Sequence, residues 1–133
     1  MDIRAWLNRG WKLDTEIKML EQAKAEERRR VLSITSSPSN TVVSGTKDPH
    51  KYDRLIELES KIDEIIDREI AIKKEILDFI SMISDVRYRG LLIARYVRFM
   101  TWERIAVQMH YGYRQTLRLH KAALKMCEEM WRE

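Results

Sequence analysis

The C-terminal stretch Thr101–Trp131, TWERIAVQMHYGYRQTLRLHKAALKMCEEMW, contains the pattern on which the fold prediction depends. It predicts two helices joined by a corner of three or four residues. The second helix begins with an unopposed run of cationic and polar side chains. This arrangement is typical of a helix-turn-helix, in which the second helix lies in the major groove of DNA.

The spacing of residues divides this stretch into a buried face and an outward face. A helix-turn-helix needs a small residue where its helices cross, an apolar residue before the corner, and apolar residues on the inner face of the second helix. The residues predicted for these positions and for the rest of the core are Ala106, Met109, Thr116, Leu119, Ile105, Tyr111 and Ala123. The outward face of the second helix would then hold Tyr113, Arg114, Leu117, Arg118 and Lys121.

The outward side chains are of the types that contact DNA. Arginine can form paired hydrogen bonds with guanine, glutamine can do so with adenine, and an apolar side chain can contact the thymine methyl group. Arg114, Gln115 and Leu117 are therefore the predicted base contacts, and Arg118 and Lys121 the predicted phosphate contacts. The candidate DNA-binding residues are Tyr113, Arg114, Gln115, Leu117, Arg118, Lys121 and, on the first helix, Arg104.

The corner departs from the usual pattern at two positions. The first corner position favours glycine because its backbone tends to adopt a positive φ, but His110 stands there. Histidine tolerates that conformation better than most residues. Gly112, a weaker cap than serine or threonine, precedes the second helix.

Positive charge is concentrated in the part of the chain that contains this motif. Residues 1–83 hold 15 Lys and Arg against 16 Asp and Glu, a net charge of −1. Residues 84–133 hold 10 against 5, a net charge of +5. A basic region confined to one domain is typical of proteins that bind the phosphate backbone of nucleic acids.

The composition predicts an all-α protein of one or two small domains. The 133 residues include only four glycines and two prolines, with 44% hydrophobic and 35% charged residues. No apolar run is long enough to span a membrane, and the N-terminus lacks the apolar core of a signal peptide, so we expect a cytoplasmic protein. The single cysteine, Cys127, agrees with a reducing compartment and is expected to pack in a helix.

Residues 1–83 predict a long helical hairpin with a flexible linker. The first helix is expected over Met1–Leu32. The serine-rich segment 33–49 is expected to be the linker. The second helix is expected over His50–Ile83 because a three-four apolar repeat, typical of a coiled coil, runs through it with one polar member. The repeat comprises Leu55, Leu58, Ile62, Ile65, Glu69, Ile72, Ile76, Phe79 and Ile83.

Further apolar residues make this face too broad for one narrow partner. They are Ile56, Ile66, Ile70, Leu77 and Ile80. The pattern does not distinguish an intramolecular hairpin from a homodimer, and we expect the two to occur together.

A separate domain is predicted over residues 84–133. Its first helix would begin after a cap at Ser84 or Asp85 and end near Arg98. The expected buried face of that helix is Tyr88, Leu91, Leu92, Tyr96 and Phe99. Thr101 would then cap the first helix of the motif, with Glu103 in its first turn.

The segment YRGLLIARYVRFMTWERIAVQMHYGYRQTLRLHKAAL resembles the C-terminal part of phage-encoded transcriptional regulators related to the ArpU and RinA late-gene activators. The matching features are the RY pair at Arg95, TWERIA from Thr101, RQ at Arg114, RLH from Arg118 and AL at Ala123. The last third of the chain matches specifically, whereas the hairpin matches only in pattern. The resemblance implies a domain similar to region 4 of the sigma-70 family and a phage or prophage transcription regulator that acts in a bacterial host.

Two classes of function follow. The first is a regulator that binds double-stranded DNA. The second is an assembly or adaptor protein, which would dock on RNA polymerase or serve as a small-terminase-like packaging subunit. An enzyme is not expected, because the sequence has no nucleophile elbow, phosphate-binding glycine loop or catalytic carboxylate pair. No cofactor is expected, and no metal site either, because His110 and His120 lack a third ligand at a suitable spacing.

Overall fold

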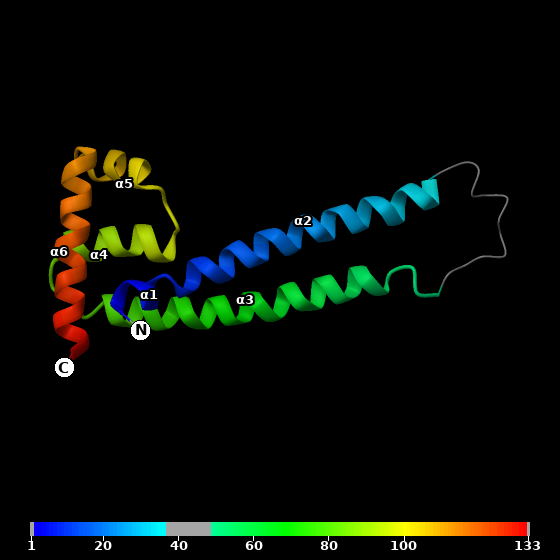
Figure 1. Ribbon diagram of the computed structural model, residues 1–133, viewed down its shortest axis with the longest axis horizontal. Coiled ribbons are helices and arrows are strands. Elements are labelled where there is room, and N and C mark those ends of the chain that lie inside the picture. The colour runs from blue at the N-terminus through cyan, green and yellow to red at the C-terminus, as the bar shows by residue number, and fades with distance from the viewer. Residues whose placement is uncertain (1, 37–48, 133) are drawn as a thin grey trace. The chain divides into compact units, whose positions relative to one another are not determined.

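The computed structural model describes residues 2–36 and 49–132, and these residues form helices and connections with no β-strand (Figure 1). All-α architecture is therefore confirmed for this part of the chain. The elements are α1 (Ile3–Leu7), α2 (Arg9–Ser36), α3 (Asp53–Ile80), α4 (Val86–Leu92), the π-helix η2 (Ile93–Val97), α5 (Trp102–Met109) and α6 (Tyr113–Arg132).

The chain divides into two compact units, one of Leu13–Arg68 and one of Met1–Lys12 with Glu69–Glu133. These bounds describe contacts between residues, and the domain boundary expected between residues 83 and 84 stays a prediction.

In the unit Leu13–Arg68, α2 and α3 pair in opposite directions. The ion pair between Lys24 and Glu59, at 3.8 Å, is followed by one between Glu27 and Arg54, at 3.9 Å, so partner numbers fall along α3 as they rise along α2. The apolar side chains of this unit that pack together are Ile17, Ile62, Ile65, Leu13, Leu20 and Ile66. Their three-four spacing explains why the two helices share one seam.

The predicted apolar repeat of α3 is confirmed, because each of its nine members is buried or half-buried. Glu69, its polar member, is buried and pairs with Lys73 at 2.8 Å. Of the residues expected to widen the seam, Ile80 is buried and Ile66 half-buried. Ile56, Ile70 and Leu77 remain exposed within the single chain.

The helices of residues 1–83 differ from the sequence prediction at four points. The first helix is interrupted at Asn8, where Arg9 Nε donates a hydrogen bond to the Trp6 carbonyl at 3.0 Å and so satisfies a carbonyl near the break. Helix α2 continues to Ser36, so the segment 33–36 is helical and not linker, and Pro49 lies in a turn. The rest of the predicted linker, 37–48, lies outside the described residues. Helix α3 begins three residues later and ends three residues earlier than expected.

In the unit Met1–Lys12 with Glu69–Glu133, α1, α4 and α5 contact α6 at successive levels along its length (Figure 1). The core contains fully buried leucines and isoleucines from α1, α3, α4 and α5, among them Leu7, Ile76, Leu91, Leu92 and Ile105. At the corner between α3 and α4, Arg89 donates hydrogen bonds to the carbonyls of Ile83 and Ser84, at 2.6 and 3.2 Å. The C-terminal helices are thus held around α6 by a shared apolar core.

The helix predicted to begin after a cap at Ser84 or Asp85 and to end near Arg98 begins as expected but changes form. The Asp85 carboxylate accepts from the Arg87 amide at 2.9 Å, which confirms it as the cap of α4. From Ile93 the chain is a π-helix, in which the Arg98 amide bonds to the Ile93 carbonyl at 2.9 Å. Phe99 then adopts a φ of 57°, a left-handed conformation that is unusual for a bulky residue.

Thr101 caps α5 as predicted, and its hydroxyl accepts from the Arg104 amide at 3.3 Å. Replacing Thr101 with alanine is expected to lower the free energy of unfolding by about 1 kcal/mol, because one amide in the first turn would lose its partner. Urea unfolding followed by circular dichroism measures this change. Thr101→Ser retains the hydroxyl and should restore most of the loss; equal destabilisation by both substitutions would contradict the capping role.

Among the described residues, no helix is both long and apolar enough to cross a membrane.

Candidate nucleic-acid interface

The corner between α5 and α6 consists of His110, Tyr111 and Gly112. His110 has φ 59° and ψ 37°, so the positive φ expected at this position is present without glycine. The Tyr111 amide bonds back to the Ala106 carbonyl at 3.0 Å, and the Gly112 carbonyl accepts from the Thr116 amide at 3.0 Å. These bonds end α5 and begin α6 within three residues.

The predicted inner face of this helix pair is confirmed. Ala106 and Thr116 are buried, and Met109 and Leu119 are half-buried against the same core. The Thr116 hydroxyl donates to the Gly112 carbonyl at 3.0 Å, which explains how a polar side chain can lie between the helices. Of the remaining core residues expected here, Ile105 and Ala123 are buried and Tyr111 is half-buried.

The predicted outward residues of α6 lie at the surface. Arg114, Arg118 and Lys121 are exposed and fall within roughly 60° of one another around the helix axis, at 100° per residue. Leu117 is half-buried on the same side. Tyr113, 47% exposed, and Gln115 are displaced from Arg114 by roughly 100° in opposite directions, so they border this face.

Sequence inspection missed one member of this face. Lys125 is exposed and lies four residues after Lys121, so it continues the same side of α6 by one turn. The three-four spacing from Arg114 was sufficient to find it. We define the cationic face of α6 as Arg114, Arg118, Lys121 and Lys125.

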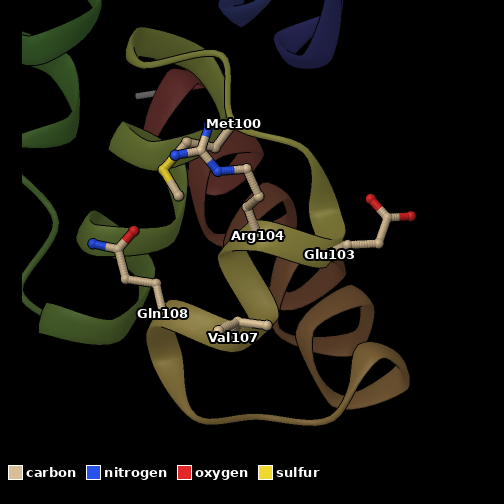
Figure 2. Close-up of a pocket in the computed structure, with 5 residues that line it drawn as sticks. All are labelled: Met100, Glu103, Arg104, Val107 and Gln108. Carbon is tan, nitrogen blue, oxygen red and sulfur yellow. The ribbon is translucent and has the colours of Figure 1, made fainter.

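Arg104 lies on the outer surface of α5 and is exposed. Figure 2 shows its side chain extending toward Met100, whereas that of Glu103 points away from it. These residues, with Val107 and Gln108, line an open cavity of about 360 Å³. Val107 is 76% exposed there, so the outer surface of α5 has an apolar part beside its cation.

A buried polar cluster lies behind α5 and α6. Tyr96 Oη and His120 Nε2 are 2.5 Å apart, and the Trp102 ring lies 4.4 Å from the His120 ring. The Arg95 guanidinium lies 4.6 Å from the Trp102 ring centre, and Arg95 Nη1 donates to the Met100 carbonyl at 3.0 Å. These contacts join η2, α5 and α6, so they help to fix the orientation of the cationic face.

Burial and two nearby arginines, Arg4 and Arg95, lower the pKa of His120 to about 4. Burial also raises the pKa of Tyr96, so the phenol stays protonated and can donate to the neutral imidazole. His120 therefore packs in the core behind the α5–α6 pair in its neutral form.

Two of the four tryptophans, Trp11 and Trp131, have substantial exposure. Trp6 packs on Phe79 with ring centres 5.3 Å apart and on Trp131 at 6.0 Å. Trp131 is itself 40% exposed, so it packs at the edge of the core. Trp11, near the start of α2, is 53% exposed and lies largely at the surface.

Cys127 is fully buried in α6, as expected, and burial raises the pKa of its thiol to about 11. The thiol is therefore expected to react with Ellman's reagent at neutral pH far more slowly in the folded protein than in urea. The absorbance of the released thiolate measures both rates. Comparable rates in the two conditions would mean that α6 opens readily.

Comparisons of the chain with protein-family models, with curated proteins and with solved structures gave no significant match.

Proposed function

We propose that the protein is a phage or prophage transcription regulator that binds duplex DNA through the α5–α6 pair, with α6 in the major groove. The main support is the cationic face of α6, which stands on the side opposite to Thr116 and Ala123 in the core. Four cations along three turns match the repeated negative charge of a DNA strand.

The side chains of this face suit distinct roles in the proposed complex. Arg114 and Gln115 lie in the first turn of α6, the part of a recognition helix that approaches base edges. Arg118 and Lys121 follow one and two turns later, where phosphate contacts set the register. Leu117 offers an apolar contact to a thymine methyl group, and Tyr113 borders the same surface. Arg104 would contact the backbone from α5.

Two further features belong to the same proposal. The resemblance of the last third of the chain to phage late-gene activators, and through them to sigma-70 region 4, supports RNA polymerase as a protein partner. Ile70 and Leu77 are 61% and 38% exposed and lie seven residues apart on α3, the spacing of a coiled-coil seam. A homodimer through α3 would cover them.

Fluorescence anisotropy with the full chain and labelled duplexes from the upstream regions of the neighbouring genes tests the proposal. We expect one duplex to bind at least tenfold more tightly than unrelated sequences. Across a salt titration the logarithm of its affinity should fall with a slope of roughly −3 to −4, because each phosphate contact contributes about −0.9. Failure to bind any duplex at low salt would contradict the proposal.

The alternative is a helical assembly or adaptor protein, and the exposed apolar residues Val107, Ile70 and Leu77 support it. Light scattering of the full chain distinguishes its variants, because a ring-sized oligomer favours a packaging subunit whereas a monomer or dimer favours regulation. A pull-down with purified RNA polymerase in the absence of DNA then tests polymerase docking.

A further inference from the structure

A second surface of the unit Met1–Lys12 with Glu69–Glu133 combines cations with aromatic rings. It is a partly open cavity of about 220 Å³, lined by Asn8, Trp11, Lys12, Arg95 and Phe99. None of these residues belongs to the cationic face of α6, and the proposed DNA contacts leave the cavity without a role.

Three departures from regular backbone geometry meet at this cavity. Asn8 is the break between α1 and α2, Arg95 belongs to the π-helix, and Phe99 has a positive φ. Single π-helical turns and strained non-glycine residues are both enriched at ligand sites, and they persist only where surrounding contacts hold them in place. Here the Phe99 ring packs 3.4 Å from the position of a Cβ on Gly10, and Lys73 Nζ lies 4.8 Å from the ring centre.

The lining of the cavity has the chemistry of an anion site with an aromatic wall. Lys12 and Arg95 contribute positive charge, and no carboxylate is among the lining residues. Within the described part of the chain, none of the ion pairs involves either cation. Trp11 is 53% exposed beside them, so much of its ring is accessible to a flat ligand.

We propose that this cavity binds a small ligand that joins one oxyanion to a flat aromatic ring. The oxyanion would pair with Lys12 and Arg95, the ring would lie against Trp11 and Phe99, and the Asn8 amide would hydrogen-bond to its polar edge. At about 220 Å³ the cavity is smaller than the roughly 300–1,000 Å³ of most ligand pockets, so a ligand of mononucleotide size would extend out of its open side. Aryl carboxylates and nucleoside monophosphates share this chemistry.

Ligand binding in this cavity would change the surroundings of residues in the α5–α6 pair. Arg95 bonds to the Met100 carbonyl, directly before the cap of α5, and lies over Trp102. Trp102 in turn contacts His120 of α6. A ligand that pairs with Arg95 therefore changes the surroundings of Trp102 without touching it. Ligand binding itself is independent of whether the protein binds DNA.

Nuclear magnetic resonance of the ¹⁵N-labelled full chain tests the site, because the indole N–H groups give separate signals. The probes are adenosine 5′-monophosphate and indole-3-acetate; inorganic phosphate and acetate supply the anion alone, and adenosine and indole the ring alone. We expect at least one combined probe to shift the Trp11 signal and, by a smaller amount, that of Trp102. It should bind at least about tenfold more tightly than its separate parts, since a charge-assisted hydrogen bond contributes this much.

Substitutions locate the binding surface. Lys12→Gln should weaken the combined probe about tenfold, because it removes one of the two cations. Lys61→Gln, on an exposed position of α3, is the matched control and should leave the affinity unchanged. A response to the nucleotide alone identifies a phosphate ligand, and a response to the indole acid alone a carboxylate ligand. The proposal is overturned by an unshifted Trp11 signal at 10 mM of both combined probes, by separate anions binding as tightly as the combined probes, or by equal affinities of the two variants.

Discussion

Replacing Arg114 with alanine is expected to lower the affinity for the specific duplex by roughly 5- to 150-fold, since a paired arginine–guanine contact contributes about 1–3 kcal/mol of discrimination. Unrelated duplexes should lose much less, so the ratio of specific to non-specific affinity should fall. Arg114 is exposed in the first turn of α6 and takes no part in the core, so the variant should fold normally. Anisotropy with single-base variants of the duplex would identify the base pair at which the preference relaxes.

Two further variants separate base recognition from general attraction. Lys121→Ala should weaken all duplexes by a similar factor and reduce the salt slope by about one, because it removes one phosphate contact. Arg28→Ala removes an exposed cation from α2, outside the cationic face, and should change neither quantity. If Arg28→Ala weakens binding as much as Arg114→Ala, the affinity for DNA depends only on the net charge of the protein, and α6 is not the recognition helix.

The free energy of unfolding is expected to fall by about 2 kcal/mol between pH 7 and pH 5, because His120 is buried in its neutral form. The folded-state pKa of about 4 lies below the ordinary value of 6.5, so the unfolded chain binds the proton more readily. Stability from this group is complete above pH 6.5 and is lost as the pH falls toward 4. The groups that face it are Tyr96 on η2, Arg4 on α1 and Arg95. Urea unfolding at pH 7, 6 and 5 measures the change.

Variants at the same position assign this pH dependence. His120→Gln retains a polar partner for the Tyr96 hydroxyl but does not titrate, so its stability should change little between pH 7 and pH 5. His120→Phe offers a second non-titrating side chain if the glutamine variant is too unstable to compare. Hydrogen bonds from Arg87 and Arg30 lower the pKa values of Asp85 and Glu27. The contributions of these two carboxylates to the free energy of unfolding are therefore lost only at a pH below this range. A wild-type pH slope in both variants would rule out His120 as its source.

Neighbouring residues along the chain account for the predictions that are confirmed. The three-four repeat of α3 identifies its buried side because helical periodicity alone places those residues on one face. Thr101 was recognisable as a cap, and Asp85 as one of two candidates with Ser84, because a cap bonds to amides two or three residues away. The exposure of Arg114, Arg118 and Lys121 follows from the same periodicity once Thr116 and Ala123 are assigned to the core. Their role in binding DNA stays a proposal.

Contacts between distant segments decide the features that local patterns do not contain. Gly10, two residues after the break at Asn8, lies against the ring of Phe99, some ninety residues later. The π-helix and the positive φ of Phe99 follow no residue preference, since phenylalanine disfavours that conformation, and only surrounding packing can impose it. The pairing of Tyr96 with His120 likewise joins residues 24 positions apart. Periodicity thus determines which side of each helix is buried. Long-range packing determines where helices bend and which buried polar groups meet, because the energy of a bend or of a buried polar contact depends on partners that the local sequence does not specify.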